Sequence, residues 1–164
     1  MAKIQISGID AYVKHFNELA NKADAINAEC LYDAAGYAAD QVRAALENMP
    51  ERPAHRTAED HKHRLFGATP SEKRQIINNF GISRFDRIGS KITVRIGFHG
   101  MVDTPSKRWN NSVPTGYLMQ AINDGTEFRN PTRTMNRTQK AIKQQVVGQM
   151  QMFLYKKTKE LLEQ

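Results

Sequence analysis

The first third of the chain alternates apolar and polar residues with the period of an α-helix. The pattern predicts one helix that begins after Ser7 as N-cap and runs to about Lys22. Asp24 can cap a second, longer helix, which ends near Met49 because Pro50 follows it. The apolar stripe expected for the first helix consists of Ile9, Tyr12, Val13, Phe16, Leu19 and Ala20. The stripe of the second consists of Ile26, Cys30, Ala34, Tyr37 or Ala38, Gln41 or Val42, Ala45 and Met49.

The centre of the second helix has unusually small side chains, reading A-A-G-Y-A-A over residues 34–39. A glycine inside a helix costs about 1 kcal/mol relative to alanine. We therefore expect another segment to approach the backbone closely at Gly36. Two partners are compatible with this pattern, a helix of the same chain or a helix of a neighbouring copy. Cys30 lies on the apolar side and is expected to be a small core residue rather than a nucleophile.

Residues 50–67 form a polar stretch with two prolines and no sustained period. Loops of this length without secondary structure are usually functional or disordered. We expect a basic arm that becomes ordered when it binds a partner. Its candidate contact residues are Arg56, His61, His63 and Arg64.

The middle of the chain predicts a short helix followed by a β-hairpin. Thr69 is the expected N-cap, with Pro70 at the first helical position and Glu72 three residues after the cap, which together form a capping box. Residues 82–98 then form two strands joined by a turn in which Gly89 comes first, as a type II′ turn prefers. The outgoing strand alternates less cleanly than the return strand, whose apolar positions are Ile92, Val94 and Ile96.

A second stretch without regular pattern, residues 100–116, holds the single tryptophan, Trp109. Lys107 and Arg108 precede it, so the indole could stack on a nucleic-acid base. The interpretation we favour is a loop anchor whose ring covers the edge of the core, because no further aromatic residues interleave with the basic ones.

Residues 117–131 predict a short helix, a stop and the start of a long terminal helix. Gly125 is expected to end the short helix, since glycine adopts a left-handed backbone without strain. Asn130 can cap the terminal helix, and Pro131 fits its first position. The short helix is expected to bury one face, made of Tyr117, Leu118, Ala121 and Ile122. The link between the two helices contains two candidate contact residues, Glu127 and Phe128.

The terminal helix is expected to run from Pro131 nearly to the end of the chain, which is long for a globular domain. The order of elements predicts an α+β fold, in which N-terminal helices and the long C-terminal helix pack on a small antiparallel β-sheet. One domain is expected over residues 1–164, with mobile loops at about 50–67 and 100–116. The apolar stripe of the terminal helix is Met135, Ala141 or Ile142, Val146, Met150, Phe153 or Leu154, and Leu161.

The chain of 164 residues carries a net charge of +7 and has a pI near 9.6. This favours acidic partners, nucleic acid included, although scattered basic residues equally fit a solvated surface that faces an acidic neighbouring subunit. A single cysteine excludes an internal disulfide and suits a reducing compartment. The first residues do not follow the basic-then-apolar pattern of a signal peptide, so synthesis in a cytoplasm is expected.

The sequence contains no motif that predicts catalysis. The phosphate-binding, dinucleotide-binding, serine-hydrolase and zinc-protease motifs are absent from the sequence, so we expect no enzyme and no cofactor. A further hypothesis is a metal-dependent enzyme built on His55, His61 and His63 beside Glu59. Lys62 and Arg64 would oppose a cation there, and no further ligands complete the set, so a metal is not expected.

Three segments carry a family resemblance. They are I-I-N-N-F-G-I-S-R-F at residues 76–85, I-T-V-R-I-G-F-H-G at residues 92–100 and Y-L-M-Q-A-I-N-D-G-T-E-F at residues 117–128. Placed between N-terminal helices and a long C-terminal helix, they resemble the small neck and tail-completion proteins of long-tailed bacteriophages, also called minor tail or head–tail joining proteins.

The resemblance implies a structural protein without catalysis. It would form a ring, expected to contain six copies, between the connector of the capsid and the tail tube, through which DNA passes. The expected partners are other copies of the chain, connector or head-closure proteins and tail-tube or tail-terminator proteins, in a virion assembled in the host cytoplasm. The alternative function is a basic nucleic-acid-binding module that uses Arg52, Arg56, Lys62, Arg64, Lys107, Arg108 and Trp109.

Overall fold

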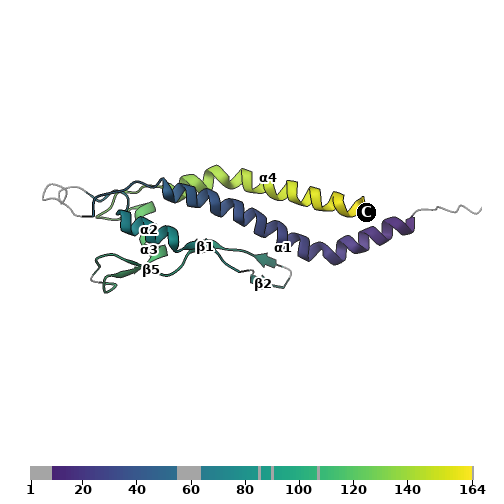
Figure 1. Cartoon of the computed structure of the whole chain (residues 1–164), viewed down its shortest axis with the longest axis horizontal. Helices are drawn as coiled ribbons and strands as arrows, with labels where there is room; N and C mark the ends of the chain where they lie inside the picture. Colours follow the sequence, from purple (N-terminus) through teal and green to yellow (C-terminus); the bar gives the residue numbers. More distant parts are fainter. Residues whose placement is uncertain (1–8, 55–63, 85, 90, 107, 164) are drawn as a thin grey trace, which may run out of the picture.

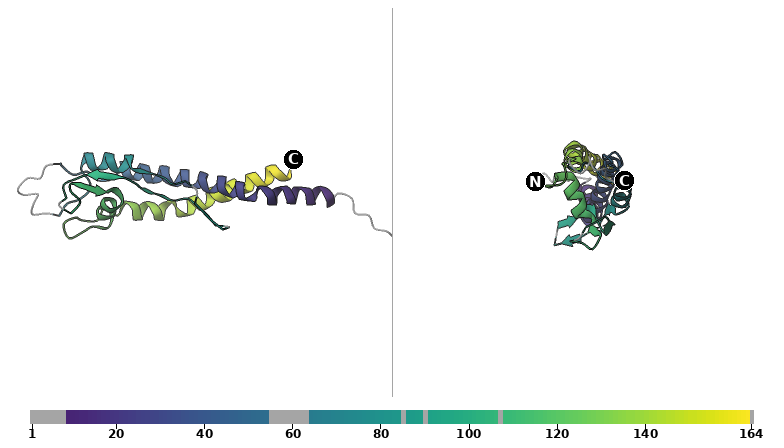
Figure 2. Two further views of the ribbon diagram at one scale, coloured as in Figure 1. Left: turned by 90° about the horizontal axis from the view of Figure 1, so that it is seen from below. Right: turned by 90° about the vertical axis from the view of Figure 1, so that its left-hand side faces the viewer.

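Two long antiparallel helices form a stalk, and a small head of short helices and strands lies at one end of it (Figure 1). The computed structural model describes residues 9–54, 64–84, 86–89, 91–106 and 108–163. Helices and short antiparallel strand pairs confirm the expected α+β class. Figure 2 shows how elongated the molecule is and how narrow it looks from the end.

The first long helix, α1, is continuous from Ile9 to Glu47, so the predicted break between Lys22 and Asp24 is wrong. Lysine, alanine and aspartate are all tolerated inside a helix, and neither glycine nor proline interrupts this region. The Asp24 carboxylate accepts a hydrogen bond from Arg87 of a neighbouring strand instead of capping a helix. In the sequence, the aspartate at this position predicted a helix start. In the structure, its side chain pairs with a distant residue instead.

The second long helix, α4, spans Thr134–Leu162 and returns along α1. The predicted start at Asn130 and Pro131 is wrong, because the backbone amide of Asn130 donates to Leu65 O and Arg133 has a left-handed φ of 57°. The first turn of α4 is capped from another helix, since the amide of Met135 donates to Asn123 Oδ1 at 2.8 Å. No local pattern could have revealed a cap supplied from a distance.

An antiparallel ribbon of strands lies on the other side of α1 (Figure 1). Strand β1 (Phe80–Ile82) pairs with β4 (Ile96–Phe98), and β2 (Asp86–Ile88) pairs with β3 (Lys91–Thr93). This confirms the predicted hairpin, and Gly89 has the positive φ of 61° that its turn requires. Three residues separate the paired segments on the outgoing side and two on the return side, so the register shifts by one. That shift explains why the outgoing strand alternates poorly.

The head contains two short helices and a second hairpin. Helix α2 (Pro70–Asn78) begins with the predicted capping box at Thr69, and α3 spans Thr115–Asp124. Strands β5 (Met101–Asp103) and β6 (Ser112–Pro114) pair within residues 100–116, where we expected no regular structure. Each strand has only three residues, too few to show alternation, and one buried valine in each strand faces the other.

The hydrophobic core lies in the head and uses only the C-terminal half of α1. Leu118 and Ile122 of α3 are buried as predicted, whereas Met119 is buried in place of the half-exposed Tyr117. On α1, Gln41 is exposed and Leu46 supplies the buried position that the predicted stripe omitted. The core residues are Ala39, Val42, Leu46, Met49, Ala68, Ile76, Phe80, Val102, Val113, Leu118, Met119 and Ile122.

Candidate interaction surfaces

A buried carboxylate holds the base of the 50–67 loop. Glu72 is 2% exposed and accepts hydrogen bonds from the amide of Thr69 at 2.8 Å and from the hydroxyl of Thr104 at 2.6 Å. Arg52 donates to both carboxylate oxygens. Burial alone would raise the pKa of Glu72, but these hydrogen bonds and the charges of Arg52 and Arg129 outweigh it and lower that pKa. Glu72 therefore stays ionised, and its hydrogen bonds join three segments: the start of α2 and the segments that contain Arg52 and Thr104.

A second buried charge, Arg129, closes the cluster from the other side. Its guanidinium donates to the carbonyl of Gly67 at 2.6 Å and is 8% exposed. Burial lowers the pKa of Arg129, and the Glu72 carboxylate opposes this shift. The sequence placed Glu72 correctly through its capping box, but it gave no signal that Arg129 would be buried beside it.

The backbone around Gly67 fixes where the loop enters and leaves the head. Gly67 has a φ of 76°, and a Cβ atom there would lie 2.1 Å from Pro50 O. The amide of Leu65 donates to Phe128 O at 2.9 Å, so the end of the loop runs beside the link between α3 and α4. Phe66 and Phe128 are both exposed at this end of the head.

Three of the predicted contact residues are thus brought together. Arg64, Glu127 and Phe128 lie on the two segments that pair at the loop base, and all three are exposed. Arg56, His61 and His63, together with His55, Glu59 and Lys62, lie outside the described residues. Within the part of the chain that the structure describes, no three His, Cys, Asp or Glu side chains gather as metal ligands.

Trp109 serves as an anchor, which confirms the interpretation we favoured. It packs against the core, and its ring lies 5.8 Å from that of Tyr117. The Arg108 guanidinium lies over the indole at 5.3 Å from the ring centroid. Both contacts involve the indole ring on which a nucleic-acid base would have to stack. Arg52, another residue of the alternative nucleic-acid-binding module, forms an ion pair with Glu72.

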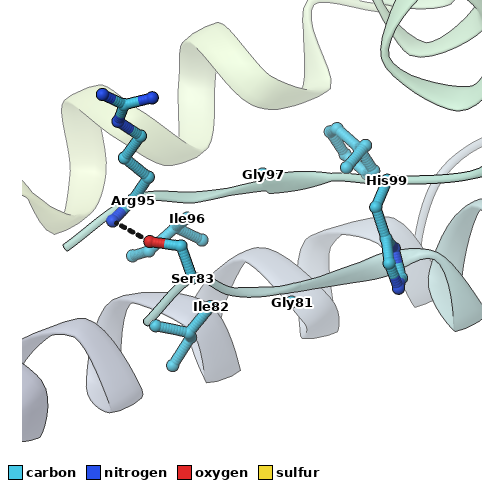
Figure 3. Close-up of a pocket in the computed structure, with 8 residues that line it drawn as sticks. Gly81, Ile82, Ser83, Arg95, Ile96, Gly97 and His99 are labelled. Carbon is cyan, nitrogen blue, oxygen red and sulfur yellow. Dashed lines mark hydrogen bonds between the residues drawn. The ribbon is translucent and has the colours of Figure 1, made fainter. Parts of the chain in front are cut away.

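A shallow groove of about 440 Å³ crosses the ribbon between β1 and β4 (Figure 3). Gly81 faces Gly97 across the strand pair, and a Cβ atom at either position would meet nothing within 4 Å. Ile82 and Ile96 line one end of the groove and Phe98 and His99 the other. Because glycine has no side chain, the ribbon backbone at these two positions is accessible to a neighbouring molecule.

The stalk carries apolar residues that the described chain does not cover. None of the 29 residues of α4 is buried. A stripe of partly buried residues, which includes Met150, faces α1, and Cys30 Sγ lies 3.5 Å from Met150 O. Burial and the Asp33 charge raise the pKa of this thiol. On the outward side of α4, Val147 and Tyr155 are 48% and 72% exposed, and Met152 and Leu162 are exposed as well.

Helix α1 extends beyond the end of α4, as Figure 2 shows. Val13 and Phe16 in this extension are 50% and 60% exposed. Val13 lies a whole number of heptads before the buried Ala34, and Phe16 lies a whole number of heptads before the buried Cys30. The two residues therefore continue the face of α1 that is buried further along the helix.

Gly36 lies on the half-exposed side of α1, and a Cβ atom there would meet nothing within 4 Å. The expectation that another segment of the same chain approaches it closely is therefore wrong for the described residues. A helix from a neighbouring copy stays a prediction.

Comparisons with protein-family models, with curated proteins and with solved structures found no match to this chain. Among the described residues, no helix is both long and apolar enough to cross a bilayer.

Proposed function

We propose that this protein is a structural component of a bacteriophage particle that acts through contacts between copies of itself. In this role it forms a ring, of six copies by the family resemblance, at the interface between head and tail. The ring joins the capsid connector to the tail tube and lets DNA pass. Assembly takes place in the host cytoplasm, and the protein ends in the neck or tail of the virion.

The observation that carries the proposal is the uncovered stalk. A 29-residue helix without one buried residue, and with exposed apolar side chains on its outward side, leaves apolar surface that the single chain does not cover. Exposed apolar surface of this extent is typical of a protein interface. The open groove on the ribbon and the unpaired outer edges of its short strands add two further places where a neighbour can bind.

The arrangement of the head supports contacts to other proteins of the particle. The Glu72–Arg129 cluster fixes the base of the loop, while Phe66 and Phe128 remain exposed beside it. A rigid base that presents exposed aromatic side chains is a common design for a docking surface. The segment before α2 and the link between α3 and α4 lie at the end of the molecule opposite to the free end of the stalk (Figure 1).

The test is the mass and shape of the purified protein. Native mass spectrometry is expected to show one closed oligomer, and negative-stain electron microscopy a ring with a channel wide enough for double-stranded DNA. A protein that stays monomeric at every concentration, also with connector and tail-tube proteins added, would refute the proposal. DNA binding of sub-micromolar affinity with a steep salt dependence would instead favour the nucleic-acid-binding module.

A further inference from the structure

The outward side of α4 carries a continuous stripe suited to another helix. Val147, Gln151, Tyr155 and Leu162 fall within an arc of about 80° at 100° per residue. Between Gln144 and Tyr155 the sequence contains no charged residue. A surface helix normally carries charge on its solvent side, so this uncharged stripe is suited to contact with a partner.

The charges beside the stripe indicate which partner. Helix α4 carries six basic residues and one acidic residue, whereas α1 carries seven acidic and three basic residues. Pairing α4 with α4 would bring like charges together, and so would pairing α1 with α1. Contact between α4 of one copy and α1 of another brings opposite charges together, so complementarity selects this arrangement.

The outward side of α1 has the matching pattern. Asp33, Asp40 and Glu47 recur there at helical spacing, and Gly36 lies among them with open space above its backbone. On α4, Arg137 and Lys140 lie on the outward side, near the head. The residues without an ion-pair partner in the described part of the chain include Asp40, Glu47, Arg137 and Lys140.

The positions of these groups along the axis of the stalk are also compatible with contact between α4 of one copy and α1 of the next. Cys30 contacts Met150 and Tyr37 contacts Gln145, so Gly36 and Gly148 lie within about one helical turn of each other along the stalk. Copies related by rotation about an axis parallel to the stalk keep the same height. The uncharged part of α4 would then face Gly36 of the next copy, and its basic end would face Asp40 and Glu47.

We propose that the outward stripe of α4 (Val147, Gln151, Tyr155) packs on the outward side of α1 (Asp33, Gly36, Asp40) of the next copy. The two surfaces differ, so the contact is heterologous and repeats from copy to copy until the ring closes. This inference rests on the proposed function, because it names the subunit contact of that ring.

Cross-linking between two single-cysteine variants tests the contact. Asp33→Cys and Val147→Cys, which lie at similar positions along the stalk, are each made in a Cys30→Ala background, and both replaced residues are exposed. Mixed subunits are expected to form a disulfide-linked dimer on mild oxidation, whereas neither variant alone should do so. A dimer from Val147→Cys alone, or from Asp33→Cys alone, would overturn the proposal.

Charge reversal provides a second measurement that does not depend on disulfide geometry. Asp40→Lys with Glu47→Lys is expected to raise the subunit dissociation constant at least about tenfold, and so is Arg137→Glu with Lys140→Glu. A chain with all four changes should regain assembly, since the charges are again complementary. Intact rings that show neither cross-link nor charge effect would overturn this contact but leave the ring, whereas a permanent monomer would overturn both proposals.

Discussion

Replacing Glu72 by glutamine should destabilise the head strongly. The carboxylate accepts hydrogen bonds from the Thr69 amide, the Thr104 hydroxyl and Arg52. Glutamine removes the negative charge and turns one oxygen into a donor, which then faces donors. Breaking a buried ion pair by removing one partner costs about 3–5 kcal/mol. At about 2–4 °C per kcal/mol for a chain of this size, 3 kcal/mol lowers the melting temperature by about 6–12 °C.

The control is Glu51→Gln, which breaks an ion pair of similar length. Lys73 Nζ lies 2.8 Å from Glu51 Oε1, but the Glu51 side chain is 50% exposed. Exposed pairs contribute about 0–1 kcal/mol, so this variant should unfold close to the parent protein. Urea unfolding at pH 7, followed by circular dichroism, compares the two. Equal stability of both variants would refute the argument that burial makes Glu72 important.

The pH dependence supplies an independent check on Glu72. Its pKa is lowered in the folded state, so its stabilising contribution is complete above the ordinary carboxyl pKa of about 4.3 and is lost as the pH falls from there through the lower folded value. The stability difference between the parent protein and Glu72→Gln should therefore shrink over that acidic window. A difference that stays constant down to the folded pKa, or that grows on acidification, would contradict the assignment.

Three further predictions concern the glycines and the free end of the stalk. Gly67→Ala should destabilise by more than the roughly 1–3 kcal/mol that a strained φ costs, since Cβ would also meet Pro50 O; a smaller loss in a urea titration would contradict the clash. Gly36→Ala should raise the stability of the monomer by about 0.4–1 kcal/mol, measured the same way, because nothing lies near its Cβ. Phe16→Gln should change monomer stability by less than about 0.5 kcal/mol, whereas Leu46→Ala should lose about 2–5 kcal/mol; a large loss for Phe16→Gln would mean that the chain covers its own extension.

The sequence predicted the elements whose signals are local. The capping box at Thr69, the turn at Gly89 and the stop at Gly125, with its φ of 83°, all depend on a few neighbouring residues. The same local logic failed where tertiary partners decided the outcome. Asp24 pairs with Arg87 instead of starting a helix, and α4 begins where Asn123 supplies a cap from α3.

The candidate surfaces likewise combine residues that the sequence indicated with contacts that only the tertiary structure reveals. The sequence placed Arg64 in a polar loop and Phe128 in the link between two helices. The two segments pair beside the buried Arg129, whose guanidinium donates a hydrogen bond to Gly67 O. An arginine in a polar segment normally indicates exposure, so no pattern could have predicted that Arg129 is buried. The number of residues between two segments says nothing about the carbonyl that a distant side chain will reach.

The position of Gly36 shows why the pattern of a single buried face is insufficient for a helix that is proposed to contact a second copy. Its small neighbours Ala34, Ala35, Ala38 and Ala39 are buried within the chain, while the glycine itself has open space above it. A period of 3.6 residues predicts one buried face, yet a helix that also contacts a second copy needs two. The apolar stripe of α4 that faces α1 satisfied the expected pattern, so its outward stripe at Val147 and Tyr155 became evident only when the structure left it exposed. On the proposed contact, the helices of the stalk pack at two levels, within the chain through one face and between copies through the other.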